Sequence, residues 1–358
     1  MRNFANRFLA LILLAMLSAP VNGQLYEHLS GPYGGGAKMY EGRNGILFQY
    51  SGTSSVFYRS LDGGTNWQLA SLPTHVTSGV FSVGADGSLF LLFFNEIFKS
   101  SDNGLSWGKI NLPPLPSVEK ITSLSDGTLL CFGDVLIYRS TNNGQLWTLT
   151  NFGAGIFVDF HPSQRPGWVF VTTLEEIFLS KDGGQTWSKF YWDYSLGPLV
   201  DFAESPKAGF FFSGRDVILH LDSLGKLVVK TTVRKTTNGP VQMTLSTSGW
   251  LFAVEHETAH YSNDYGKTWN DFSDQGIDLA HFKYFFSSRS GTVFGIRQNG
   301  SLYRSNDNGV NWAFSAFGLQ EAWVRELDFL SDREIMARTS DGLFHSSDKG
   351  KKWNLLAV

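Results

Sequence analysis

Short apolar runs recur along the whole sequence and are separated by groups of Gly, Asn, Asp and Ser. One stretch shows the pattern in full, with strand-like runs at Lys120–Leu124, Thr128–Phe132 and Leu136–Ser140 and a fourth run that begins at Trp147. Runs of this length, rich in β-branched and aromatic residues and bounded by turn residues, predict β-strands. The stretch therefore predicts a unit of four antiparallel strands, named A to D in chain order.

The unit repeats, and each repeat is marked by the pattern Ser-x-Asp-x-Gly-x-x-Trp between its third and fourth strands. The serines of this box lie at positions 60, 100, 140, 180, 262, 305 and 346, and one box has Asn in place of Asp. The double step from 180 to 262 predicts a degenerate copy near 220, and His220–Gly225 keeps the Asp and the Gly there. The box carboxylates and the amide are Asp62, Asp102, Asn142, Asp182, Asp264, Asp307 and Asp348.

The residue types of the box suit a tight turn between two strands. An Asp or Asn side chain can accept backbone N–H bonds inside a tight turn, and Ser does the same more weakly. Gly supplies the positive φ that such turns often need. The Trp begins the return strand and covers the hairpin with apolar surface. The box residues are therefore predicted to be structural.

Four-stranded units of about 40 residues are typical of propeller blades. We therefore predict an all-β fold, a single β-propeller of four-stranded antiparallel blades, with eight blades expected and seven as the alternative. Tyr26–Leu29 resembles an extra outer strand that could pair across the seam of the ring.

The first 23 residues differ from the rest of the chain. Arg2 and Arg7 precede the apolar run Phe8–Leu17, and small residues precede Gln24. This is the pattern of a secretory signal peptide, so residues 1–23 are expected to be removed before Gln24, leaving 24–358 as the propeller domain. We expect a secreted, periplasmic or cell-surface protein without a transmembrane segment in the mature chain.

Composition excludes some classes of function. The formal charge of -3 leaves no basic footprint for nucleic acid. The sequence has no phosphate loop and no metal-ligand spacing beyond His256 and His260, which span a predicted turn, so neither a cofactor nor a metal is expected. Cys131 is the only cysteine, lies in a predicted strand and reads as a small buried residue.

At its boxes the sequence resembles the Asp-box (BNR-repeat) propeller superfamily. That group includes sialidases, sortilin-type receptors, xyloglucan-cleaving hydrolases and photosystem II assembly factors, so the resemblance implies the fold and leaves the function open. The first-blade arginine motif of sialidases is absent, because Arg43 lies in a Gly-Arg-Asn-Gly turn instead, and Arg59, Arg139 and Arg304 occupy a repeated strand position. Gly34–Gly36 leads to Ala37 without the aspartate that the xyloglucan-cleaving branch has.

Antiparallel order places the A–B and C–D turns on one face of a blade ring and the B–C and D–A connections on the other. Because compact boxes occupy the first face, ligand binding is predicted on the second. Its candidates are the B–C turn residues and an aromatic D–A cluster: Glu96, Asp134, Glu175, Glu176, Arg215, Asp216, Glu257, Trp192, Tyr194 and Trp323. These carboxylates could form an acidic rim, or could simply be turn residues, and the aromatic residues could bind a ligand or pack between blades.

Two functional hypotheses follow. The first is a non-enzymatic recognition or assembly module that binds protein or glycan on the face opposite the boxes. The alternative is a sialidase-like or xyloglucanase-like glycoside hydrolase that uses rim carboxylates, which would require two carboxyl groups about 5–10 Å apart.

Overall fold

The computed structural model describes residues 38–51, 56–73, 79–114, 117–133, 135–153, 155–193, 195, 197–214, 217–231, 241–255, 258–272, 282–297, 302–315, 324–331, 334–339, 342–348 and 353–357. The predicted signal peptide, Tyr26–Leu29 and Gly34–Gly36 lie outside these residues.

The described chain forms eight four-stranded antiparallel sheets, each with its strands in sequence order, as predicted. The A strands are β1 (Lys38–Glu41), β5 (Val80–Val83), β9 (Lys120–Ser123), β13 (Phe157–Pro162), β17 (Leu199–Ser205), β21 (Val241–Leu245), β25 (Phe282–Ser287) and β29 (Val324–Phe329). The B strands are β2 (Leu47–Ser51), β6 (Leu89–Phe93), β10 (Leu129–Gly133), β14 (Val169–Thr173), β18 (Gly209–Gly214), β22 (Leu251–Glu255), β26 (Val293–Arg297) and β30 (Ile335–Thr339).

The outer half of each sheet completes the pattern. The C strands are β3 (Val56–Ser60), β7 (Glu96–Ser100), β11 (Leu136–Ser140), β15 (Glu176–Ser180), β19 (Ile218–Leu221), β23 (Thr258–Ser262), β27 (Leu302–Ser305) and β31 (Gly342–Ser346). The D strands are β4 (Gln68–Leu69), β8 (Gly108–Ile110), β12 (Thr148–Leu149), β16 (Ser188–Trp192), β20 (Leu227–Thr231), β24 (Asn270–Asp271), β28 (Ala313–Phe314) and β32 (Asn354–Ala357). The short helix η1 (Arg43–Gly45) lies in the first A–B turn, and no described helix is long and apolar enough to span a membrane.

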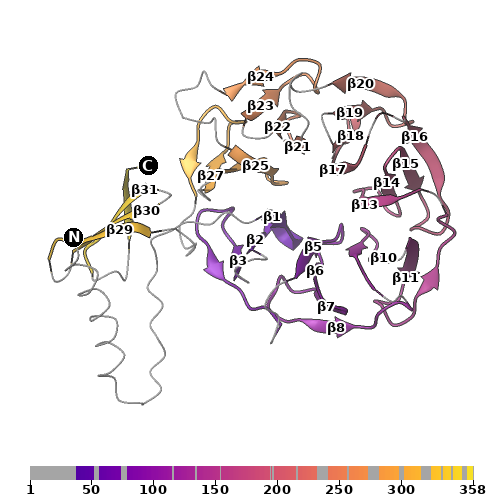
Figure 1. The fold of residues 1–358 in the computed structure, drawn as a ribbon, viewed down its shortest axis with the longest axis horizontal. Helices are drawn as coiled ribbons and strands as arrows, with labels where there is room; N and C mark the ends of the chain where they lie inside the picture. Colours follow the sequence, from indigo (N-terminus) through magenta and orange to yellow (C-terminus); the bar gives the residue numbers. More distant parts are fainter. Residues whose placement is uncertain are drawn as a thin grey trace, which may run out of the picture.

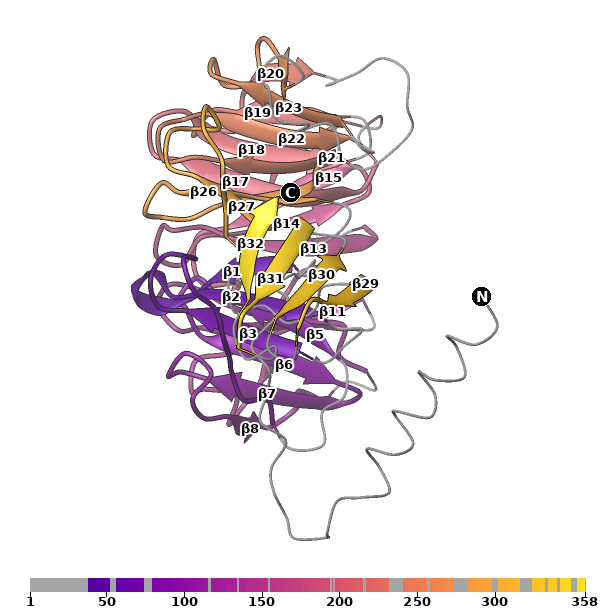
Figure 2. The same ribbon diagram turned by 90° about the vertical axis from the view of Figure 1, so that its left-hand side faces the viewer.

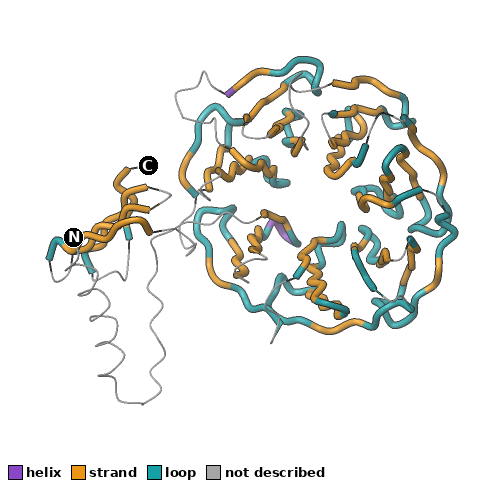
Figure 3. The backbone as a smooth tube through the Cα atoms, in the orientation of Figure 1, coloured by secondary structure: helices purple, strands orange, loops and turns teal. Residues whose placement is uncertain are grey.

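Seven of the sheets surround a central channel, and the eighth lies beside the ring (Figure 1, Figure 2). The A strands face the channel and the D strands form the outer rim (Figure 3). We call the seven sheets blades one to seven. The side with the A–B and C–D turns is the box face, and the side with the B–C turns and D–A connections is the loop face.

Blade one packs directly on blade seven and closes the ring. Met39, Leu47 and Trp67 of blade one share an apolar cluster with Phe294 and Ile296 of blade seven. Burial of such side chains contributes roughly 25 cal/mol per Å² of apolar surface. The prediction of eight four-stranded units is confirmed, and the ring itself contains seven of them.

The boxes form the turns that the sequence predicts. In blade four, Ser180 Oγ accepts the N–H of Gly184 at 2.8 Å and donates to Asp182 Oδ1 at 2.7 Å. The same Asp182 oxygen accepts the N–H groups of Gln185 and Thr186 at 3.0 and 2.9 Å. The box of blade four thus satisfies the backbone donors of its own turn, and its carboxylate is engaged in structure.

The degenerate copy in blade five forms a tighter turn. Asp222 Oδ1 accepts the N–H groups of Leu224 and Lys226, each at 2.9 Å, and Gly225 adopts a φ of 85°. The D strand β20 starts at Leu227, directly after this turn. The predicted fifth unit is therefore a complete blade without the box Ser and Trp.

The eighth sheet differs from the ring blades at the fourth position of its B strand. Most ring blades place an apolar residue there, such as Ile296, which is buried against the next blade, and blade four has the uncharged Thr172. The eighth sheet has Arg338 at the matching register, and its side chain is 68% exposed, with Nε 3.9 Å from Glu326 Oε2. Inserting this sheet between two blades would bury a charged group, which is costly, and this explains why the sheet lies outside the ring.

Candidate binding site on the loop face

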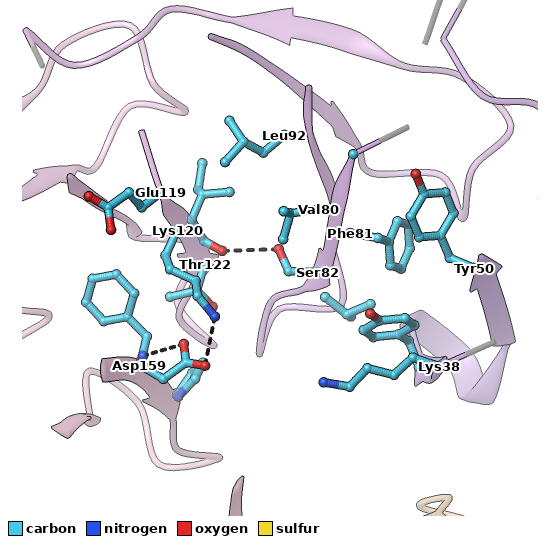
Figure 4. A pocket seen from close by; sticks show the side chains of 16 residues that line it. Lys38, Tyr50, Val80, Phe81, Ser82, Leu92, Glu119, Lys120, Thr122 and Asp159 are labelled. Carbon is cyan, nitrogen blue, oxygen red and sulfur yellow. Dashed lines mark hydrogen bonds and ion pairs between the residues drawn. The ribbon is translucent and has the colours of Figure 1, made fainter. Parts of the chain in front are cut away.

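A cavity of about 610 Å³ lies at the channel wall of blades one to four. Its wall is built mainly from the A strands β1, β5, β9 and β13, whose side chains converge from four blades (Figure 4). Lys38, Gly79 and Glu119 lie at the loop-face ends of their blades, whereas Val83 and Pro162 end their A strands beside the box face, so the cavity runs along the channel wall between the two faces. Val80 and Leu92 contribute apolar surface, and Ser82 and Thr122 contribute hydroxyl groups.

Charged groups in the cavity come from blades one, three and four. Lys120 Nζ lies 2.9 Å from Asp159 Oδ2, and this ion pair joins blades three and four. The ammonium group of Lys38 lies 6.0 Å from the ring centre of Tyr40, and Figure 4 shows it extending into the cavity. Glu119 is exposed beside Lys120. The site thus combines an available cation, an ion pair and apolar surface.

A partly buried acid, Asp201, lies on the A strand β17 of blade five. Burial raises the pKa of Asp201, and its Oδ2 accepts the N–H of Met243 at 3.1 Å. Lys38 opposes this rise in pKa and Asp159 adds to it. Burial also raises the pKa of Tyr284, with further contributions from Asp201 and Tyr40. These groups are hydrogen-bond donors in their neutral forms.

Two B–C turns on the same face display apolar side chains at their tips. Phe94 is 86% exposed and has a φ of 50°, and Val135 is 70% exposed and has a φ of 62°. They belong to blades two and three, which also form the cavity. The exposed apolar residues Phe94 and Val135 therefore belong to two of the four blades that line the cavity.

The predicted carboxylates of blades two and four point away from the channel. Glu96 Oε1 lies 2.6 Å from Lys109 Nζ, and Glu176 Oε1 lies 2.5 Å from Lys189 Nζ. Both lysines are on outer D strands, because β8 and β16 pair with the C strands that start at Glu96 and Glu176. These two glutamates do not form an acidic rim around the channel, and their role in ligand binding stays a prediction.

Of the other predicted ligand-binding residues, the structure describes Glu175 and Trp192. Glu175 is exposed, and its carbonyl oxygen accepts the N–H of Asp193 at 3.0 Å. Trp192 is 55% exposed and ends β16 at the outer rim. Six candidates lie outside the described residues: Asp134, Tyr194, Arg215, Asp216, Glu257 and Trp323.

The arginines before the boxes have a repeated structural role. Arg139 Nε donates to the carbonyl oxygen of Gly183 at 2.7 Å, and Arg304 Nη1 donates to Thr65 Oγ1 at 2.5 Å. Each bond reaches the box turn of the following blade, with blade one following blade seven. These two side chains therefore link neighbouring blades, as their repeated strand position indicates.

Sequence reasoning missed Lys38, Lys120, Asp159 and Asp201. All four lie on A strands, whose polar positions look like ordinary alternation in a half-exposed strand. Polar residues on the predicted A strands could have indicated this site, because every A strand of a propeller faces the same channel. Within the part of the chain that the structure describes, no group of His, Cys, Asp and Glu side chains is placed to hold a metal ion.

Comparisons with known proteins agree with this architecture. The BNR/Asp-box repeat family matches residues 178–189, which contain the box of blade four. A search of curated protein sequences finds no match. The predicted resemblance to Asp-box propellers is confirmed at the level of the repeat and the fold.

Three solved structures illustrate the similarity. The structure described as YCF48 bound to D1 peptide is 15% identical, covers 92% of this chain and 99% of its own, and has a TM-score of 0.53. A GH74 xyloglucanase from Xanthomonas campestris is 13% identical, with 91% and 68% coverage and a TM-score of 0.63. A streptogramin B lyase is 15% identical, with 75% and 92% coverage and a TM-score of 0.57. At these identities the likeness establishes the β-propeller fold alone.

Proposed function

We propose that this protein is a non-enzymatic recognition module that binds a protein partner on its loop face. The observation that carries the proposal is the channel cavity, whose wall places Lys38 and the Lys120–Asp159 pair beside the apolar Val80 and Leu92. Apolar pockets with a few directed polar groups are typical binding sites. This combination suits an extended segment with an aliphatic side chain and a carboxylate.

The comparisons support a peptide-binding propeller as one precedent. The solved structure described as bound to D1 peptide aligns over almost the full length of both chains. The bound peptide is a property of that protein, whose identity to this chain is only 15%. Protein recognition by this chain therefore rests on the cavity.

Reversing the charge of the cavity tests the proposal. Mature protein is used to capture partners from the compartment in which it resides, and the captured species is then titrated against purified variants. Lys38→Glu and Val80→Asp are expected to reduce its affinity at least tenfold, because they remove the cation and the apolar wall. Leu146→Ser on the box face, where Leu146 is 72% exposed, is the matched control. Equal affinity for all variants would refute the proposal.

We further propose that the protein acts outside the cytoplasm. The support is the signal-peptide pattern of residues 1–23. Amino-terminal sequencing of the protein from its native source should begin at Gln24. An intact N-terminus in a cytoplasmic fraction would contradict this location.

A glycoside hydrolase is the second candidate, because two channel carboxyls differ in environment. Burial raises the pKa of Asp201, whereas Asp159 forms an ion pair with Lys120. Glycoside hydrolysis uses two carboxyl groups held in unlike environments. Turnover of xyloglucan or a sialoside that is lost in Asp201→Asn would favour this candidate over recognition. Glycan binding without turnover would instead support a non-enzymatic module with a glycan ligand.

A further inference from the structure

Phe94 and Val135 occupy backbone conformations that their residue types adopt only at a cost. Phe94 lies in the turn between β6 and β7, and Val135 lies in the turn between β10 and β11. Positive φ values of 50° and 62° are unusual for an aromatic and a β-branched side chain. Four of the other non-glycine residues described with positive φ are asparagines, which tolerate this region.

The side chains of Phe94 and Val135 make few packing contacts that would offset this cost. Phe94 is 86% exposed and its ring contacts only the edge of Phe93 among the described aromatic contacts, with 4.6 Å between the ring centres. Val135 is 70% exposed. Strained residues of this kind persist where function selects them. The pair therefore combines backbone strain with exposed apolar surface on the loop face of two blades that also line the cavity.

The surroundings indicate the chemistry of a partner. Leu92, which lines the cavity, lies two residues before Phe94 and joins the two features on blade two. Glu119 and Glu175 are exposed on the neighbouring blades three and four. Exposed carboxylates disfavour a surface with anionic groups and favour a basic one.

We propose that Phe94 and Val135 are apolar anchors for a protein partner whose apolar surface is bordered by basic side chains. This inference rests on the proposed function, and it extends the interface from the cavity to the B–C turns of blades two and three. Aromatic and aliphatic anchors that become fully desolvated carry most of the affinity of many interfaces.

Site-specific photo-crosslinking tests the placement of the interface. A benzophenone amino acid replaces Phe94 or Val135 in the full mature chain, and Leu105 or Leu146 as matched box-face controls that are 65% and 72% exposed. The variants are exposed to an extract of the protein's own compartment and irradiated. One protein should be crosslinked from positions 94 and 135 and not from 105 or 146. Adducts from the box-face positions alone, or from no position, would overturn the inference.

Titration of that crosslinked protein tests the anchors themselves. The double variant F94G V135G should bind it at least tenfold more weakly, while its melting temperature is equal to or higher than that of the wild type, because Gly adopts positive φ freely. Unchanged affinity in the double variant overturns the inference, and if Lys38→Glu still weakens binding, the proposed function stands. Unchanged affinity in both variants overturns both. Flotation with phosphatidylcholine vesicles that depends on Phe94 would replace the protein partner with a lipid surface.

Discussion

The indole Nε1 of Trp67 donates to the carbonyl oxygen of Ser315, 2.9 Å away and 248 residues later in the chain. The same bond joins Trp107 to Ser71 and Trp147 to Asn111, each at 2.9 Å and each reaching from one blade to the preceding one. Ring closure between blades one and seven therefore repeats a contact that the chain uses elsewhere. These three box tryptophans therefore link neighbouring blades.

This bond predicts that replacing two of the box tryptophans costs different amounts of folding free energy. Trp187 Nε1 is buried and has no hydrogen-bond partner among the described residues, whereas Trp107 Nε1 bonds to Ser71. Both Trp→Phe variants lose similar apolar surface, but only Trp107→Phe loses a hydrogen bond, so it should cost about 1 kcal/mol more. Urea denaturation of the two variants measures this difference. Equal losses would show that the inter-blade bond adds nothing to stability.

The boxes predict a loss of stability in acid. The Ser106 hydroxyl, together with the Ser106 N–H, lowers the pKa of Asp102 to about 2. Because the unfolded value is about 3.9, this contribution is complete above pH ~4 and is lost as the pH falls through the folded value. Melting temperatures between pH 5 and pH 2 should fall less steeply for Asp102→Asn than for the wild type. Asn142 already accepts the N–H of Leu146 at 2.9 Å in a natural box of this kind. Parallel curves would contradict the assignment.

The position of the eighth sheet predicts that the ring does not depend on it. Its described apolar cluster consists only of its own side chains, around Ala337, Phe344 and Trp353. Deleting residues 324–358 should therefore leave the closed ring, with a melting temperature within a few degrees of the full chain. Ser315, which bonds to Trp67, is retained in this variant. Loss of the cooperative transition would show that the sheet is part of the ring.

Cys131 should be unreactive in the folded protein. Its side chain is fully buried on β10, and burial raises the pKa of the thiol to about 12. Because the thiolate is the reactive form, a maleimide should label Cys131 only after denaturation. Labelling at the rate of a small-molecule thiol under native conditions would contradict the burial.

The sequence predicts the fold because its strongest signals are local. Ser180, Asp182 and Gly184 satisfy one another within a single turn, so the pattern alone is sufficient to predict the hairpin. Even the degenerate turn at Asp222 keeps the residues that make its hydrogen bonds. The number of blades in the ring depends on packing between sheets, and its one visible signal is a charge, Arg338, at a position where the ring blades have uncharged residues.

The site was less predictable, because it depends on which strands meet at the channel. Lys38 and Asp159 lie over 100 residues apart and share a cavity only after the ring closes. The sequence predicts Glu96 at the channel rim, but its ion pair with Lys109 holds the side chain towards the outer strand β8. Nothing in the sequence distinguishes Phe94 from other turn residues, because its strain arises from the turn conformation.

We propose that the loop face, and not the box face, binds the partner. Hydrogen–deuterium exchange of the mature protein, alone and with the captured partner, measures both faces at once. We expect slower exchange in β5 and β9 and in the turns at Phe94 and Val135, with unchanged exchange in the box turns at Asp102 and Asp182. Protection confined to the box turns would contradict it.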